Sequence, residues 1–255
     1  MVCVGNGNSA KQLHHTNNNG IDTGDADGLG HIRAKELQES AKKLGLRSES
    51  DVLIIEDPSR FADGMKNTWA ENDISSILTS AFAPELAAAA LSSNKKQQQQ
   101  QKKGNKPPVA TIDVLLTFDK HGVSNHPNHR SLYHGAVHFL RTLMKDKAGF
   151  SCPITLYTLS TTTLLRKYLG IFDAPLTMFR GALHTLFSGG GGGKNKGNKK
   201  DDLPRQLLFV NSVPEYLTAQ SAMVNAHRSQ MVWFRWGWIA IGRYMIVNDL
   251  RKERI

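Results

Sequence analysis

Residues 110–129 read ATIDVLLTFDKHGVSNHPNH and join an apolar, β-branched run directly to a loop that is rich in histidine. The run up to Phe118 predicts a buried strand, and a helix through about Met144 is expected after the loop. In open α/β sheets, ligands bind outside the carboxyl ends of the strands. The loop from Asp119 to His129 therefore lies where a functional site is expected.

The segments on either side of this stretch continue an alternation of short apolar runs and helical patterns. Strands are predicted at MVCV, 51–57, 153–160 and 206–211, and helices at 32–44, 69–91, 162–170 and after Ser212. Ser212-Val213-Pro214-Glu215 resembles a capping box with an early proline. In the helix at 32–44, Ile32, Leu37 and Leu44 are expected to share an apolar face, with Ala34 and Ala41 nearby. We predict one α/β domain over 1–255, with a mostly parallel sheet and helices on both faces.

The net charge of +10 is concentrated in two low-complexity segments, 92–108 and 188–202. Together they hold nine lysines and two aspartates, so they account for seven of the ten charges. We interpret both as solvated insertions, which removes the main argument for a nucleic-acid partner. The lone Gly5-Asn6-Gly7 lacks the third glycine of a dinucleotide loop, and the only cysteines, Cys3 and Cys152, favour a reducing compartment.

The histidine loop leaves two interpretations open on spacing alone. His126 and His129 are separated by three residues, which brings two imidazoles to one side of a turn, as a metal ligand and its neighbour require. Capping or surface histidines would give the same spacing. Asp119 either orients a ligand imidazole or caps the loop, while His121, His134 and His138 are expected to pack or to face solvent.

Four segments in order resemble the LmbE-like zinc deacetylases, and more narrowly their eukaryotic branch. TFDKHGVSNHPNH (117–129) is similar to the second signature of that family, and GLGHIRAKEL (28–37) is similar to its G-x-x-x-R-x-x-E-L helix. LLRKYLGIFDAPL (164–176) and HRSQMVWFRWGWIAIGRYMIVN (227–248) resemble two later family segments. The resemblance covers nearly the whole chain apart from the two insertions.

The resemblance implies a Rossmann-like fold and a zinc-dependent amide hydrolase. The expected substrate is the glycolipid N-acetylglucosaminyl-phosphatidylinositol, at the cytosolic face of the endoplasmic reticulum membrane, in the second step of GPI-anchor synthesis. His129 would bind Zn²⁺ or another divalent metal, and His126 would stabilise the oxyanion or protonate the leaving amine. Arg33 would bind substrate, although a surface arginine paired with Glu36 is an equal alternative.

One family signature, the A-H-P-D-D-E run, does not occur in these 255 residues. In the family that run supplies two zinc ligands and the general base. We therefore expect the chain to begin at the second strand of the family, without the first strand–helix unit and an amino-terminal membrane helix, and to be inactive by itself. The alternative is an inactive homologue that retains only partner or lipid binding.

The carboxy-terminal segment predicts contact with a membrane surface. Aromatic rings with interspersed arginines suit the headgroup region of a bilayer, where arginines reach toward phosphate. The arginines are Arg228, Arg235 and Arg243, and the large apolar residues are Trp233, Phe234, Trp236, Trp238, Ile239, Ile241, Tyr244 and Met245. The alternative is that these side chains complete the core.

Overall fold

The computed structural model describes residues 2–4, 29–48, 51–55, 57–93, 106–187 and 203–255, and they form two compact units. The first unit consists of the described parts of Met1–Asn18, Glu56–Thr161 and Leu250–Ile255. The second consists of the described parts of Asn19–Ile55 and Thr162–Asp249. The predicted insertion at 188–202 lies outside the described residues, and only the ends of the one at 92–108 are described.

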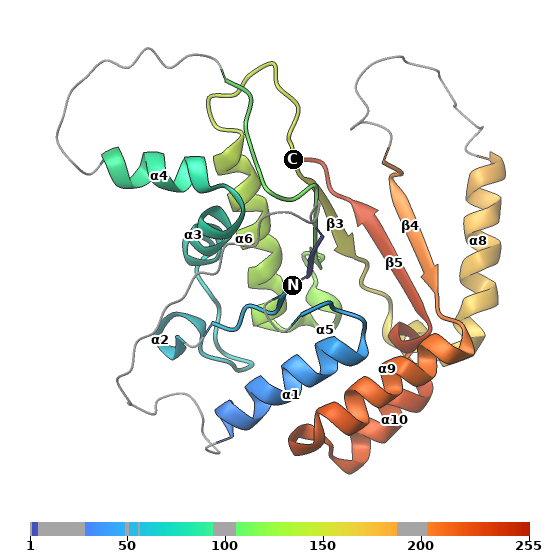
Figure 1. Ribbon diagram of the computed structural model, residues 1–255. Helices are drawn as coiled ribbons and strands as arrows, with labels where there is room; N and C mark the ends of the chain where they lie inside the picture. The colour runs from blue at the N-terminus through green and yellow to red at the C-terminus, as the bar shows by residue number, and fades with distance from the viewer. Residues whose placement is uncertain (1, 5–28, 49–50, 56, 94–105, 188–202) are drawn as a thin grey trace. The chain divides into compact units, whose positions relative to one another are not determined.

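The first unit combines a sheet with helices (Figure 1). Its elements are β1 (Val2–Val4), α2 (Pro58–Phe61), α3 (Glu71–Phe82), α4 (Pro84–Ser93), β2 (Val114–Phe118), α5 (Gly122–Asn125), α6 (Pro127–Leu143), β3 (Thr155–Leu159) and the end of β5 (Val247–Lys252). The strand order is β1-β2-β3-β5, in which β2 and β3 are parallel while β1 and β5 pair antiparallel with their neighbours. The α/β class is confirmed, but the expectation of a mostly parallel sheet is wrong for these pairings. The parallel pair β2 and β3 is joined by a connection that contains α5 and α6, as a parallel crossover requires.

The core of this unit lies between α3, α6 and strands β2 and β3. Gly135 of α6 faces Ile74 of α3 so closely that a Cβ atom at position 135 would lie 2.4 Å from the Cβ of Ile74. Leu115, Phe139 and Leu140 are completely buried in the same cluster. This packing fixes α6, and α6 carries the histidine pair on its first turn.

The second unit contains the remaining elements (Figure 1). They are α1 (Gly30–Lys43), α7 (Leu164–Lys167), η2 (Gly170–Phe172), α8 (Asp173–Phe187), β4 (Gln206–Val210), α9 (Val213–Ala226), η3 (Arg228–Gln230), α10 (Trp233–Ile241), η4 (Arg243–Met245) and the start of β5. The predicted capping box is confirmed, because the Ser212 amide donates to Glu215 at 2.6 Å. Among the described residues, no helix is long and apolar enough to span a bilayer.

Two expectations for the early part of this unit are wrong. Residues 51–55 form no strand, and Leu53 and Ile55 are exposed, because a β-branched run becomes a strand only where a neighbouring strand can pair with it. Helix α1 exists, but Ile32, Leu37 and Leu44 are exposed; of the expected apolar face only the neighbouring Ala41 is buried, together with Glu36 and Ser40. Glu36 is buried because its carboxylate accepts hydrogen bonds from the amide and hydroxyl of Ser229, at 2.7 and 2.6 Å.

Candidate active site

The site begins where β2 ends, at a loop held by the carboxylate of Asp119. Its Oδ1 accepts from the amides of His121 and Gly122, both at 3.0 Å, and its Oδ2 accepts from the Thr161 amide at 2.6 Å. The hydroxyl of Thr161 donates to Asp119 Oδ1 at 2.6 Å. Of the two roles left open for Asp119, the structure therefore shows the loop cap. It ties the loop after β2 to the residues after β3.

The clamped loop has an unusual backbone. Gly122 has φ +61°, and Val123 and Asn125 have φ 61° and 58°. A positive φ is uncommon for a β-branched residue, and such conformations persist only where the surroundings impose them. Here the amide of Val123 donates to Thr161 Oγ1 at 2.9 Å. This turn leads directly into His126, which is the N-cap residue of α6.

His129 is held by two contacts, one with the end of β2 and one with this loop. Its ring stacks on Phe118 with the centroids 4.1 Å apart, and its Nδ1 donates to the Gly122 carbonyl oxygen at 3.1 Å. A metal-binding histidine characteristically donates its other ring N–H to a carbonyl or a carboxylate, which fixes the tautomer. The hydrogen bond to Gly122 leaves the lone pair on Nε2. Burial lowers the pKa of His129, the Gly122 carbonyl raises it, and the nearby His126 lowers it, with a net lowering that favours the neutral ring.

His126 has the opposite ring tautomer. Its Nδ1 accepts a hydrogen bond from the Asn128 amide at 3.3 Å, as the cap of α6. An accepting Nδ1 places the proton of the neutral ring on Nε2. The two imidazole centroids lie 5.0 Å apart. The pair thus offers one lone pair and one N–H donor, and neither Nε2 has a partner among the described residues.

Asn128 and Asp63 complete this corner of the first unit, and sequence reasoning missed both. The side-chain amide of Asn128 donates to Asp63 Oδ1 at 2.7 Å, and Asp63 Oδ1 also accepts from the Gly64 amide. The Oδ1 atom of Asn128 is buried without a partner within the described residues. A buried acceptor of this kind calls for a donor. No spacing rule connects positions 63 and 128.

The described residues fit a metal site only in part. His129 has the free Nε2 and the oriented ring of a ligand, but a catalytic zinc site normally uses three protein ligands. Among the described residues, no group of three or more histidine, cysteine, aspartate or glutamate side chains is arranged to hold an ion. His129 is therefore the single ligand candidate in this part of the chain.

The other predicted residues fall elsewhere. Arg33 is an exposed residue of α1 in the second unit, so its role in substrate binding stays a prediction. His121 is exposed, as expected. His134 and His138 point their Nδ1 atoms at the carboxylate of Glu71, at 3.8 and 4.0 Å. They lie outside the His126–His129 pair.

The two imidazoles lie beside the carboxyl end of β2, the place where ligands bind in open α/β sheets. Comparison with known proteins gives the family. The model of the PIG-L family, described as GlcNAc-PI de-N-acetylase, matches residues 1–140. The chain belongs to this family of deacetylases, whose members are metal-dependent.

Curated relatives agree along most of the chain. The N-acetylglucosaminyl-phosphatidylinositol de-N-acetylase of Arthroderma benhamiae is 54% identical over 246 residues, which cover 91% of this chain and 70% of the relative. The enzyme of that name from Saccharomyces cerevisiae is 28% identical over 241 residues, covering 90% and 68%. The probable enzyme of that name from Schizosaccharomyces pombe is 27% identical over 232 residues, covering 91% and 72%. No match was found among the solved structures.

Proposed function

We propose that the protein hydrolyses the N-acetyl group of N-acetylglucosaminyl-phosphatidylinositol, which gives glucosaminyl-phosphatidylinositol and acetate in the second step of GPI-anchor synthesis. The observation that carries this proposal is the arrangement of His126 and His129 at the carboxyl end of β2, where the backbone holds one ring nitrogen of each. The 54% identical relative is named for the same reaction. An inactive homologue that only binds lipid or a partner is not favoured, because these relatives are named as de-N-acetylases.

In this proposal, His126 stabilises the transition state. When water attacks the acetamide carbon, negative charge develops on the carbonyl oxygen, and a positioned N–H donor stabilises that charge. Nε2–H of His126 is such a donor, and the Asn128 amide holds the ring by its other nitrogen. Protonation of the departing amine would require the imidazolium form of His126, which gives up its Nε2 proton to the amine and returns to the neutral ring.

His129 serves as a metal ligand in this proposal, through Nε2. A bound Zn²⁺ or similar divalent ion supplies Lewis acidity that polarises the amide carbonyl. The Gly122 carbonyl and the Phe118 ring orient the imidazole, and burial, which lowers its pKa, favours the neutral form. The further ligands that a catalytic ion requires are not among the described residues.

We further propose that the protein works at a membrane surface, on the cytosolic face of the endoplasmic reticulum. A lipid-linked substrate supports this location, as do the exposed side chains of α10. Of the eight large apolar residues predicted to face lipid, the exposed ones are Trp233, Phe234, Trp236, Trp238 and Ile241. Ile239 is buried, and Arg243 is completely buried, so the expectation that Arg243 reaches toward lipid phosphate is wrong.

The catalytic proposal is tested with the full-length protein expressed from its own gene, because the 255 residues by themselves lack the A-H-P-D-D-E run and are expected to be inactive. We expect release of acetate from N-acetylglucosaminyl-phosphatidylinositol in the presence of Zn²⁺. We expect His129→Ala to lose bound metal, measured by elemental analysis, and His126→Ala to keep metal while losing turnover. Absence of acetate release by the metal-loaded wild-type protein, or retention of metal by His129→Ala, would overturn the proposal.

The membrane proposal is tested by flotation with vesicles that contain phosphatidylinositol. The double variant Trp236→Ala/Trp238→Ala should float less than the wild type, because two exposed rings are lost. Phe209→Ala, which removes an exposed ring from β4, is the matched control and should float like the wild type. Equal flotation of the double variant and the wild type would contradict a lipid role for α10.

A further inference from the structure

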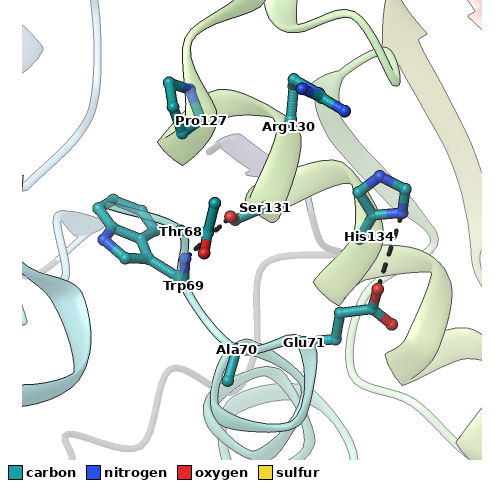
Figure 2. A pocket seen from close by; sticks show the side chains of 8 residues that line it. All are labelled: Thr68, Trp69, Ala70, Glu71, Pro127, Arg130, Ser131 and His134. Carbon is teal, nitrogen blue, oxygen red and sulfur yellow. Dashed lines mark hydrogen bonds and ion pairs between the residues drawn. The ribbon is translucent and has the colours of Figure 1, made fainter. Parts of the chain in front are cut away.

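A pocket of about 320 Å³ lies beside the catalytic histidines, within the first unit. Figure 2 shows its wall, which is built from the residues leading into α3 and from the first two turns of α6. Pro127, between His126 and His129 in the sequence, lines it directly. Ser131 Oγ accepts from the Trp69 amide at 2.9 Å, so a long-range hydrogen bond fixes the two sides of the wall to each other. The pocket is therefore part of the folded frame that also positions the histidine pair.

The polar groups of this pocket are of two kinds. Arg130 is exposed and forms no ion pair with any residue that the structure describes. Glu71 lies across from α6 with His134 and His138 as neighbours, at 3.8 and 4.0 Å. In Figure 2, His134 points toward Glu71, whereas Arg130 lies at the other end of the pocket, away from Glu71. The pocket thus offers a guanidinium that has no ion-pair partner within the described residues, and a carboxylate that can accept further hydrogen bonds.

This combination matches a ligand that carries both a phosphate and hydroxyl groups. A guanidinium presents its N–H donors in the planar fork that fits phosphate oxygens, whereas a carboxylate only accepts and so recognises hydroxyl donors. A purely anionic ligand would be repelled by Glu71. A neutral polyol would give the Arg130 guanidinium no anionic group to pair with. An inositol phosphate satisfies both groups.

The distance from the catalytic turn is suitable for the proposed substrate. Arg130 follows His126 by four residues, which is about 6 Å along a helix axis, and its side chain extends farther. In N-acetylglucosaminyl-phosphatidylinositol the sugar and inositol rings separate the acetamide from the phosphodiester. A phosphate held by Arg130 leaves room for those rings between it and His126.

We propose that this pocket binds the phosphoinositol part of the substrate, with Arg130 on the phosphodiester and Glu71 on inositol hydroxyls. The proposal rests on the proposed deacetylase function for the identity of the ligand. Arg130 and Glu71 are binding residues here, and the chemistry at His126 and His129 is separate from them.

Calorimetric titration with myo-inositol 1-phosphate tests the pocket without any need for turnover. We expect Arg130→Ala to weaken binding at least tenfold and Arg130→Lys to restore part of the loss. Arg141→Ala is the matched control, because it removes the same charge from an exposed position on the same helix outside the pocket, and it should bind like the wild type. Thermal denaturation of each variant checks that the fold is retained.

Inorganic phosphate and myo-inositol as second and third probes separate the two halves of the pocket. Glu71→Gln should weaken the binding of myo-inositol 1-phosphate. The affinity for inorganic phosphate should stay unchanged or increase, because a repelling negative charge is removed. Equal affinity of the wild type for phosphate and for myo-inositol 1-phosphate would overturn the role of Glu71. Absence of binding by the wild type, or equal binding by Arg130→Ala, would overturn the proposal as a whole.

Turnover of two substrates separates failure of this proposal from failure of the proposed function. The substrates are N-acetylglucosaminyl-phosphatidylinositol and N-acetylglucosaminyl-inositol, which lacks the phosphate. Arg130→Ala should reduce kcat/KM at least tenfold for the first and change it little for the second. If the wild type releases acetate but Arg130→Ala slows both substrates equally, the pocket proposal fails. If the wild type releases acetate from neither, the deacetylase proposal fails.

Discussion

The histidine pair at the start of α6 and the arginine–aspartate cluster around Asp173 both place polar groups inside the fold, with different consequences. In the cluster, Arg243 donates to Asp173, to Asp249 Oδ2 at 2.8 Å and to the Val247 carbonyl at 3.1 Å. Arg166 donates to both carboxylate oxygens of Asp173, at 2.8 and 3.0 Å. In the pair, each imidazole uses one ring nitrogen for the fold and has no partner on the other among the described residues.

This difference distinguishes polar residues that stabilise the fold from polar residues that are available for catalysis or ligand binding. Buried charges are tolerated when they are paired and hydrogen-bonded, and removal of one partner leaves an uncompensated charge. A ring nitrogen without a protein partner adds nothing to stability, and it is available for a ligand or a proton transfer. Both regions carry family-like motifs. In the cluster, Asp249 Oδ1 has no partner among the described residues, but it is buried among paired charges, whereas in the pair the Nε2 atoms of both rings are left for a ligand or a proton transfer.

The largest expected effect is on turnover, in a variant that lacks the free Nε2–H donor of His126. His126→Asn keeps a side-chain acceptor for the cap of α6 but lacks the imidazole N–H, so turnover should fall by about 10²–10⁴-fold. The free energy of unfolding should change little, because asparagine is a favoured cap. Acetate release and urea denaturation measure the two quantities. If His126→Asn retained turnover, the N–H donor to the transition state would have to be a residue other than His126.

The next largest expected effect is on the free energy of unfolding, in a variant that lacks one partner of the arginine–aspartate cluster. Arg243→Met leaves Asp173 and Asp249 with fewer partners in a completely buried place, and should cost about 3–5 kcal/mol in urea denaturation. Arg60→Ala is the control, because it removes an arginine from the exposed pair with Asp57 and should leave stability nearly unchanged. Similar losses in the two variants would mean that burial does not distinguish these ion pairs.

The cluster also predicts a loss of stability in acid. Burial alone would raise the pKa of Asp173, but hydrogen bonds from Arg166, Arg243 and Thr177 outweigh it and hold the pKa at about 2. Because the folded pKa lies below the ordinary 3.8, this carboxylate contributes stability above pH 3.8, and the contribution is lost as the pH falls toward 2. The loss should be on the order of 2 kcal/mol.

Asp173→Asn provides the comparison for this acid loss. Over the same pH interval, the unfolding free energy of the variant should fall less steeply than that of the wild type. Parallel curves for the two proteins would show that Asp173 does not titrate as the hydrogen bonds require.

A smaller effect is expected at the glycine that orients His129. Gly122→Ala must adopt φ +61° and brings a Cβ to 2.9 Å from the Cβ of His129. The left-handed backbone costs about 1–2 kcal/mol, and the displaced carbonyl should weaken metal retention. Gly149→Ala shares the positive φ, at +89°, but meets nothing within 4 Å. It should show the backbone cost without loss of metal. Equal metal content in both variants would remove the Gly122 carbonyl from the site.

The sequence was sufficient for features that depend on neighbouring residues. The capping box at Ser212 and Glu215, strand β2 and helix α6 all follow from local patterns, and the structure confirms them. The resemblance also led to the family and to the histidine pair. Each of these signals is contained within about twenty residues.

Features that depend on distant residues were missed or mistaken. Residues 51–55 have a strand-like composition, but they form no strand. The partner of His129 is a backbone carbonyl, which no side-chain pattern reveals. The contact between Arg243 and Asp173 joins positions 70 residues apart. Asp119 was left with two roles, and only the approach of Thr161, 42 residues away, shows which one it has.

The central claim is that His126 and His129 have opposite neutral tautomers. Long-range ¹H–¹⁵N correlation spectra of protein with ¹⁵N-labelled histidine measure this directly at pH values where both rings are neutral, with His126→Asn and His129→Asn used to assign the signals. We predict a proton on Nδ1 of His129, held by the Gly122 carbonyl, and a proton on Nε2 of His126. The same tautomer at both rings, or a proton on Nε2 of His129, would contradict the account.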